Sequence, residues 1–171
     1  MSTKAHGSGP VQLRSQVGRP VDLHTAGVGK VILAHLESPL QQELLKTVTC
    51  RALTPTSITD PDELRRNLDE ILTRGWAEDD GEGESYVNCV ALPIYDATGL
   101  VRSGMSVTAL REIAPLPELR SLLPRFRDVS HAISATSAGA STLPARPNLK
   151  PSSGLRVQHL PVDYPSQVSE K

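Results

Sequence analysis

The chain has 171 residues, a formal net charge of −1 and only 3% aromatic residues. This length suits one domain with a substantial core and is too short for two large domains. Lys and Arg are spread along the chain, so the sequence lacks the basic surface of a nucleic-acid-binding domain, and the few aromatic residues disfavour base stacking.

The sequence also carries no sign of a membrane or an oxidising compartment. No apolar run has the length of a membrane span, and the first 16 residues lack the apolar core of a signal peptide. Cys50 and Cys89 are too few for a disulfide framework and are typical of a reducing compartment. We therefore expect a cytoplasmic protein without membrane association.

The N-terminal part leads into a glycine-rich turn. Residues 1–16 are polar and show no periodicity, which predicts a flexible arm. Residues 24–30 read HTAGVGK, a turn that opens an apolar helix with Thr25 as its expected N-cap. The turn is not a phosphate-binding loop, because His24 replaces the required first glycine and the residue after Lys30 is valine instead of Ser or Thr.

Two further helices are predicted from capping residues and hydrophobic spacing. In SPLQQELLKTV, Ser38 is the expected N-cap, and Pro39 occupies the first helical position, where its missing N–H costs nothing. In DPDELRRNLDEILTRG, Asp60 is the expected cap and Gly75 ends the helix. The apolar stripe of this helix consists of Leu64, Leu68, Ile71 and Leu72.

After the third helix the pattern changes from helical to extended. GWAEDD predicts a short strand that runs into an acidic loop, and YVNCVALPIY and LVRSGMSVTAL predict two strands joined by the turn DATG. In the last of these strands, Met105 and Val107 should lie on one face and Ser106 and Thr108 on the other. A final helix is predicted over about residues 116–136.

The ordered domain is expected over residues 17–137, as an α/β fold with a central antiparallel sheet flanked by helices. Residues 138–171 are rich in Ser and Pro and cannot bury enough apolar surface to offset their ordering entropy. We expect this tail to be disordered.

The chemically capable residues form no recognisable catalytic or metal site. The acidic run at 78–84 lacks the ligand spacing of a calcium loop and is interpreted mainly as a solvated loop. Cys89 has no identifiable base beside it and is interpreted as an apolar filler rather than a nucleophile. The five histidines show no metal-ligand spacing, and His24 is interpreted as a local hydrogen-bonding residue. The hydroxyls of Ser106 and Thr108 could line a pocket or face water. We predict no catalytic residue, metal or cofactor.

Residues 75–96, GWAEDDGEGESYVNCVALPIYD, resemble the signature segment of IclR-type bacterial transcription regulators. That segment combines spaced glycine and acidic positions with a strand of small and aliphatic residues that ends in an aromatic residue and aspartate. GRPVDLHTAGVGKVILAHL, SITDPDELRRNLDEILTRG and DATGLVRSGMSV are also similar in order and spacing, so the resemblance runs from about Gly18 to Ser137. The residues that meet the signature are Gly75, Asp79, Glu82, Cys89, Val90, Ala91, Ile94, Tyr95 and Asp96.

The resemblance implies an incomplete GAF-like effector-binding domain, in which a small organic or aromatic acid binds in a buried pocket. The glycine-rich turn would then present backbone N–H groups to a carboxylate, with Lys30 lying along the helix surface. The ligand-binding residues that the resemblance implies are Gly27, Val28, Asp79, Cys89, Ser106 and Thr108.

The family also implies homo-oligomers and a winged helix-turn-helix before the effector domain. Residues 1–17 are too short to contain one, so DNA binding is expected only through a domain outside this chain. The sheet is expected to lack its leading strands, which leaves an edge exposed. The leading interpretation is a non-enzymatic small-molecule sensor of a transcription regulator. Two alternatives stay open: a regulator remnant that binds little ligand and acts only through oligomerisation, and a small GAF-like enzyme.

Overall fold

The computed structural model describes residues 3–5, 20–137 and 156–161. Neighbouring strands all pair antiparallel, in the order β1-β5-β4-β3-β2, which confirms the predicted α/β class with a central antiparallel sheet. The elements are β1 (Thr3–Ala5), α1 (Gly27–His35), α2 (Ser38–Thr47), α3 (Pro61–Arg74), β2 (Ala77–Asp80), β3 (Val87–Tyr95), β4 (Val101–Leu110), α4 (Leu116–Ser121), α5 (Leu123–Ser137) and β5 (Arg156–Pro161).

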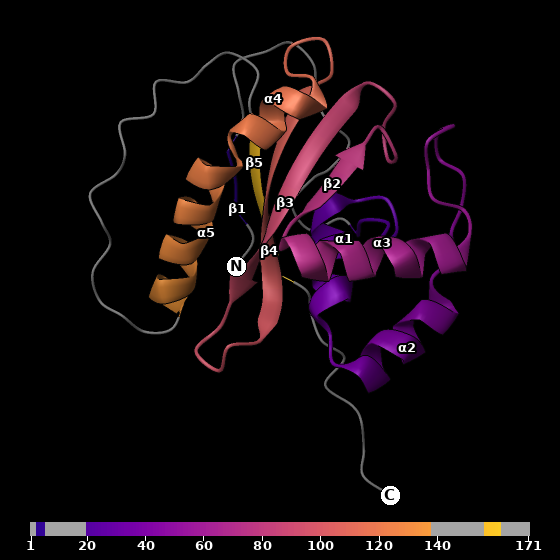
Figure 1. The fold of residues 1–171 in the computed structure, drawn as a ribbon, viewed down its shortest axis with the longest axis horizontal. Coiled ribbons are helices and arrows are strands. Elements are labelled where there is room, and N and C mark those ends of the chain that lie inside the picture. The colour runs from indigo at the N-terminus through magenta and orange to yellow at the C-terminus, as the bar shows by residue number, and fades with distance from the viewer. Residues whose placement is uncertain (1–2, 6–19, 138–155, 162–171) are drawn as a thin grey trace, which may run out of the picture.

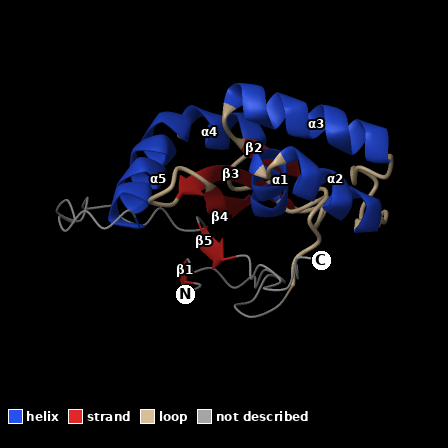
Figure 2. Ribbon diagram, turned by 90° about the horizontal axis from the view of Figure 1, so that it is seen from below, coloured by secondary structure: helices blue, strands red, loops and turns tan. Residues whose placement is uncertain are grey.

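The sheet separates two groups of helices (Figure 1). Helices α4 and α5 contact β3 from one side, whereas α1 lies over β3 and β4 on the other side and is contacted by α3. Figure 2 shows the strands between these two groups from a second direction. Each side has its own apolar core, and α1 therefore rests on the sheet face that holds the candidate site.

Helix α3 forms where its capping residues predict it. The Asp60 carboxylate accepts a hydrogen bond from the N–H of Asp62 at 3.0 Å, and Pro61 opens the helix. Gly75 ends the helix in the left-handed region, with φ 78°, and donates its N–H to the carbonyl of Ile71 at 2.8 Å. The predicted start and end of this helix are confirmed.

The predicted apolar stripe of α3 was wrong at one position. Leu64, Leu68 and Ile71 are buried, but Leu72 is 48% exposed. Helix α1 meets α3 along the line of the three buried residues, and Leu72 lies one residue further around the helix.

Strands β3 and β4 send alternate side chains into the two cores. Ala91 lies in the core beneath α1, and Ser106 stands opposite it in β4, so Ser106 and Thr108 face α1. This confirms the predicted separation of these hydroxyls from Met105 and Val107. The apolar side chains on the α4 and α5 side include Val90, Leu92, Ile94, Met105 and Val107.

The turn between β3 and β4 is organised by Asp96. Its carboxylate accepts hydrogen bonds from the N–H of Thr98 at 2.8 Å, the hydroxyl of Thr98 at 2.6 Å and the Nε of Arg102 at 2.9 Å. The Thr98 hydroxyl is the main cause that lowers the pKa of Asp96 to about 2. Gly99 adopts φ 81°, and the hairpin predicted from DATG is confirmed.

The predicted N-caps of the first two helices were wrong. Ala26, and not Thr25, precedes α1, and it makes no side-chain capping bond. Ser38 is the first residue of α2, with Glu37 before it. In both cases the helix begins one residue later or earlier than the side-chain signal indicates, within the usual uncertainty of a helix end.

The final predicted helix is divided into α4 and α5. The break falls at Leu122, whose N–H bonds to the carbonyls of Leu119 and Arg120 in a tightened turn. Pro124 follows two residues after Leu122, and because it has no N–H it cannot continue the helical hydrogen bonds of α4.

The structure differs from the predicted tail at residues 156–161. The backbone of this segment forms β5, which pairs with Ser103–Thr108 of β4 and with β1. The edge of β4, predicted to be exposed, is therefore paired, because free N–H and C=O groups accept any extended segment in register. Residues 138–155 and 162–171 of the tail, and 1–2 and 6–19 near the N-terminus, lie outside the described residues. The boundaries of arm, domain and tail stay predictions.

Candidate functional site

Three of the predicted ligand-binding residues lie in one row across three strands. Asp79 of β2 is paired with Cys89 of β3, which is paired with Thr108 of β4. Ser106 lies two residues away on the same face, opposite Ala91. All five side chains are buried, so the sheet presents a small, polar and enclosed surface at this place.

The start of α1 closes over this surface. A β-carbon added at Gly27 would lie 3.2 Å from Cβ of Ala91 and 3.3 Å from Sγ of Cys89, so the first turn of the helix leaves little room for a side chain. Val28 packs into the adjoining core, where a β-carbon added at Gly104 would lie 3.5 Å from its Cγ1. The fold thus brings the predicted ligand residues of four separate elements together.

The start of α1 has no side-chain cap. Ala26 makes no side-chain capping bond, and the first N–H groups of any α-helix have no partner within the helix. These groups lie at the positive end of the helix dipole, and this end favours an anion. Backbone N–H groups at such a helix start are of the kind that can bind an anion.

The second glycine of the turn has a packing role. A β-carbon added at Gly29 would lie 2.8 Å from Cα of Leu23 and 2.9 Å from its carbonyl oxygen, which is closer than side chains approach backbone. Gly29 is therefore required because α1 packs directly against the turn that precedes it. The two glycines of GVG therefore allow close contacts on two different sides of α1, Gly27 with the sheet and Gly29 with the preceding turn.

Asp79 organises the loop that follows β2. Its Oδ1 accepts hydrogen bonds from the N–H of Glu82 at 2.6 Å and of Gly83 at 3.4 Å. Burial raises the pKa of Asp79 to about 6, against the lowering effects of these bonds and of the positive charge on Lys30. Asp79 therefore changes charge close to neutral pH.

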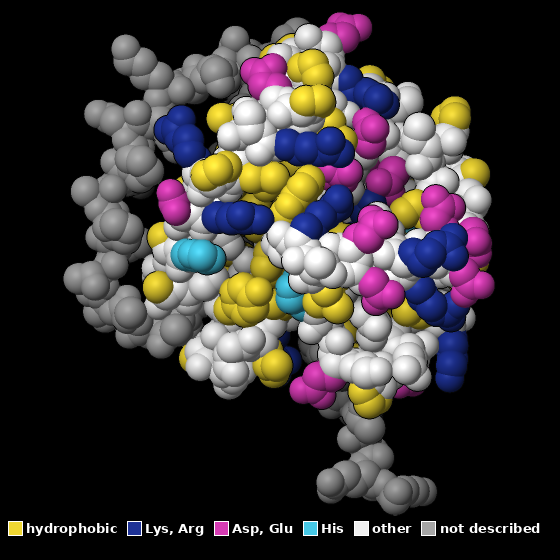
Figure 3. Space-filling view, viewed as in Figure 1, with side chains coloured by type: hydrophobic (Ala, Val, Ile, Leu, Met, Phe, Trp, Pro, Cys, Tyr) yellow, Lys and Arg dark blue, Asp and Glu magenta, His cyan; other side chains and the backbone are white. Residues whose placement is uncertain are grey.

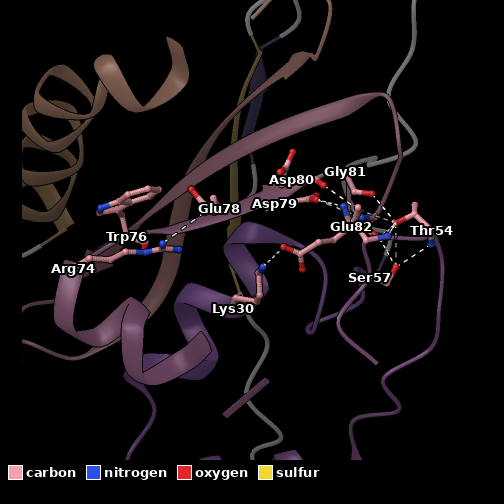
Figure 4. A network of polar contacts seen from close by, with 12 residues as sticks. Lys30, Thr54, Ser57, Arg74, Trp76, Glu78, Asp79, Asp80, Gly81 and Glu82 are labelled. Carbon is pink, nitrogen blue, oxygen red and sulfur yellow. Dashed lines mark hydrogen bonds and ion pairs between the residues drawn. The ribbon is translucent and has the colours of Figure 1, made fainter. Parts of the chain in front are cut away.

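Lys30 and Glu82 form a buried ion pair that the sequence analysis missed (Figure 4). The Nζ of Lys30 lies 2.5 Å from Oε1 of Glu82, and the two side chains are 1% and 10% exposed. The expectation that Lys30 lies along the helix surface was wrong, and Glu82, like Asp79, is buried and departs from the mainly solvated loop that the acidic run predicts. Burial raises the pKa of Glu82 to about 7, although Lys30 acts in the opposite direction.

The loop that carries Glu82 is held from a distant segment. The hydroxyl of Thr54 donates to the carbonyl of Gly81 at 2.7 Å, and the hydroxyl of Ser57 donates to the carbonyl of Glu82 at 2.7 Å (Figure 4). Sequence reasoning had a signal for Glu82, which is one of the signature positions, but none for its hydroxyl contacts, because those residues are distant in the chain.

The neighbouring acidic residue Glu78 lies on a different side of β2. Its two carboxylate oxygens accept hydrogen bonds from Arg120 at 2.8 and 2.9 Å, and Arg74 lies 3.7 Å away with its guanidinium over Trp76. On the face viewed in Figure 3, acidic and basic side chains are interspersed in this way, without a large area of one sign.

The remaining candidates carry no chemistry of their own. Burial raises the pKa of Cys89 to about 12, so the thiol stays protonated and is a poor nucleophile near neutral pH. The Nε2 of His24 donates to the carbonyl of Arg51 at 2.9 Å. Within the described residues, no group of His, Cys, Asp and Glu side chains could hold a metal ion. None of the helices in those residues has the length and apolar character to cross a membrane.

Comparison with known proteins agrees with the geometry of this site and fold. Residues 3–135 match the model of the bacterial transcriptional regulator IclR C-terminal family. The chain belongs to the IclR family of bacterial transcription regulators. The resemblance drawn from residues 75–96 is confirmed, and the matched region is the effector-binding part of these regulators.

Individual relatives lead to the same family. The chain is 33% identical over 108 residues to the uncharacterized HTH-type transcriptional regulator RhmR of Escherichia coli, covering 63% of this chain and 42% of RhmR. It is 33% identical over 98 residues to the regulator KdgR of Dickeya chrysanthemi, covering 57% of this chain and 32% of KdgR. These relatives are transcription regulators and not enzymes, and the chain spans less than half of their length.

Solved structures of IclR-family proteins share the fold. The Thermotoga maritima IclR structure superposes with a TM-score of 0.73 at 30% identity, covering 78% of this chain and 54% of that one. The C-terminal domain of Escherichia coli KdgR gives a TM-score of 0.63 at 27% identity, covering 68% and 71%. The inducer-binding domain of PobR from Acinetobacter, in complex with 3-hydroxybenzoic acid, gives 0.68 at 23% identity, covering 74% of each, and shows the fold alone.

Proposed function

We propose that this chain binds a small organic or aromatic acid between the start of α1 and the polar face of the sheet. The observation that carries the proposal is the position of Ala26 and Gly27, an uncapped helix start set directly against Cys89 of the Asp79–Cys89–Thr108 row. The N–H groups of Gly27 and Val28 are suited to a carboxylate, because a helix N-terminus favours negative charge.

The other end of the effector meets the side chains of the row. An ionised Asp79 would repel a carboxylate, so Asp79 faces either a hydroxyl or amide of the ligand, or carries a proton itself. Ser106 and Thr108 can donate hydrogen bonds to the acceptors that remain. A hydroxylated acid therefore fits this arrangement better than a simple acid.

Binding would act on transcription by shifting the populations of a larger regulator's states. We propose that the chain works in the cytoplasm as a homo-oligomer, with DNA contacted by a helix-turn-helix domain outside it. The IclR membership and the names of the relatives, which are HTH-type regulators, support this part of the proposal.

Two substitutions test the placement of the ligand. Gly27→Val puts a side chain into space already limited by Ala91 and Cys89, and should abolish binding of every small acid. Asp79→Ala should weaken a hydroxy acid by about 1–3 kcal/mol, because a buried hydrogen-bonding partner is left unpaired, and should weaken the deoxy acid less. Calorimetry with 3-hydroxybenzoate and benzoate, and with lactate and propionate, measures both effects.

A third substitution, Ser106→Ala, removes one hydroxyl of the polar face. Ser103→Ala is its matched control. Ser103 is in the same strand but stands opposite Ile94, on the α5 side of the sheet, so its loss should leave binding unchanged. Thermal unfolding of each variant separates loss of binding from loss of folding. Equal losses for both members of an acid pair at Asp79, together with intact binding in Gly27→Val, would contradict the placement.

A further inference from the structure

Glu82 is a buried carboxylate with only one of its oxygens satisfied. Its Oε1 accepts the hydrogen bond from Lys30, whereas its Oε2 is buried without a hydrogen-bond partner among the described residues. Figure 4 shows the side chain reaching from the loop after β2 back to Lys30 on α1. An unpartnered buried carboxylate oxygen is costly, and either a proton on it or a donor from a ligand removes that cost.

The buried charges around Glu82 do not balance. Lys30 supplies one ammonium group, whereas Asp79 and Glu82 supply two carboxylates. The two acidic residues are linked by a hydrogen bond from the backbone N–H of Glu82 to the Asp79 carboxylate. Among the described residues, Lys30 is the cation that pairs with them, whereas Arg111 pairs with the exposed Asp80. The other titratable groups near the cluster are Glu84, which acts on Asp79 as a like charge, Cys89, whose thiol stays protonated, and His24, bonded to the Arg51 carbonyl.

This cluster adjoins the space in front of α1. Asp79 belongs to the row beneath the helix start, and its Oδ1 binds the N–H groups of Glu82 and Gly83. A β-carbon added at Gly83 would lie 3.5 Å from Oδ2 of Asp79 and 3.7 Å from Oγ1 of Thr25, just before α1. An acid held at the helix start is therefore a near neighbour of both carboxylates.

We propose that a carboxylate effector enters this site together with one proton, which the Asp79–Glu82 pair takes up from solvent. This inference rests on the proposed function and adds Glu82 and Lys30 to the site. No covalent bond other than the new O–H changes, and the effector itself remains a carboxylate. Where both carboxyls start ionised, the pair passes from two negative charges to one. Lys30 then balances it, and the charge of the effector is the only excess left for the helix start.

The titration of the pair supports this charge count. The pKa of Asp79 is raised to about 6 and that of Glu82 to about 7, both mainly by burial, so the pair is partly ionised near neutral pH. A new negative charge nearby raises both pKa values further and draws in a proton. Affinity for an acid should therefore fall as pH rises through and above this range, by up to about tenfold per pH unit when one proton is taken up.

Calorimetry of the full chain tests the proton directly. Benzoate, 3-hydroxybenzoate, propionate and lactate are titrated at about pH 6, 7 and 8 in phosphate, HEPES and Tris, whose ionisation enthalpies differ. The dependence of the heat on the buffer gives the number of protons taken up. We expect about half a proton per bound acid near pH 7, rising toward one near pH 8, and affinity that falls toward pH 8.

Glu82→Gln identifies the acceptor. The amide cannot take up a proton, so the proton count should fall to less than half and the affinity at about pH 8 should exceed that of the unsubstituted chain. Glu78→Gln is the matched control, because Glu78 is adjacent to Asp79 but binds Arg120, and it should keep the full proton count. A purely structural role for Glu82 would change affinity without changing the proton count.

The outcomes distinguish the proton coupling from the proposed function. Acid binding without buffer-dependent heat overturns the coupling and leaves the proposed function standing, whereas no binding of any acid at any pH overturns both. An unchanged proton count in Glu82→Gln overturns the role of Glu82. Should that variant not fold, the proton count of the unsubstituted chain still decides the coupling.

Discussion

The two faces of the central sheet are built by the same strands and have opposite characters. On the α4 and α5 side, β3 and β4 bury large apolar side chains such as Leu92 and Met105. On the α1 side, the alternate residues are small or polar, with Asp79, Cys89 and Thr108 in one row. The difference shows that one buried sheet can pack a purely apolar layer on one face, while the other face combines an apolar core under α1 with a row of buried polar side chains.

The buried polar groups on the α1 side lower the stability of the fold through lost hydration. This side encloses one ammonium group and two carboxylates, and each of these groups loses hydration on burial. One carboxylate oxygen, Oε2 of Glu82, has no hydrogen-bond partner among the described residues. The face toward α4 and α5 contains no comparable ion pair in the described residues, and the apolar packing on both sides of the sheet can offset this cost. Substitutions on the two faces should therefore differ in size and in their response to pH.

The largest effect is expected for Lys30→Met. Removing the ammonium leaves Asp79 and Glu82 buried without a countercharge, which should lower the free energy of unfolding by about 3–5 kcal/mol at about pH 8. Both carboxyls have raised pKa values in the folded protein, so they hold protons at acidic pH and lose them as pH rises. The loss should therefore be clearly smaller at about pH 5.

Urea unfolding at the two pH values measures the change in stability. Lys46→Met, at an exposed position of α2, is the control and should stay within about 0.5 kcal/mol at both pH values. A loss of equal size at about pH 5 and about pH 8 would contradict the view that the buried carboxylates cause it.

The next effect is expected on the apolar face. Leu92→Ala should lower the free energy of unfolding by about 2–5 kcal/mol, because Leu92 is almost fully buried and leaves a cavity. No charge changes, so the loss should not depend on pH. Leu72→Ala on the exposed side of α3 is the matched control, with an expected loss within about 0.5 kcal/mol. Denaturant curves that give similar losses for the two leucines would contradict the placement of the core.

The smallest loss of stability is expected for substitutions of the two glycines by which α1 packs closely against its neighbours. Gly29→Ala should cost about 1–3 kcal/mol, because its β-carbon meets the backbone of Leu23, which cannot move aside without shifting the turn. Gly27→Ala should cost less stability, since its β-carbon meets only Cβ of Ala91 and Sγ of Cys89 at slightly longer distances. Thermal unfolding compares the two variants, and a larger loss at Gly27 than at Gly29 would reverse this assignment.

Much of the fold follows from short stretches of sequence. The cap at Asp60 and the left-handed Gly75 define α3, and the DATG turn defines the hairpin of β3 and β4. The alternation in β4 predicts that Ser106 and Thr108 share one face, opposite Met105 and Val107 in the apolar core. These features are predictable because their causes lie within a few residues of each other. The family could also be predicted from the sequence, because the resemblance to its signature falls on one continuous segment, residues 75–96.

The tertiary structure alone decided the charges of the site and the limits of the core. Lys30 and Glu82 are 52 residues apart, and both belong to sequence patterns typical of exposed residues, yet α1 buries them against each other. Leu72 belongs to an apolar stripe yet is exposed, because α1 covers a narrower line of α3 than the stripe offers. Sequence periodicity tells which side chains share a face, but the burial and pKa of each group depend on which distant element covers that face.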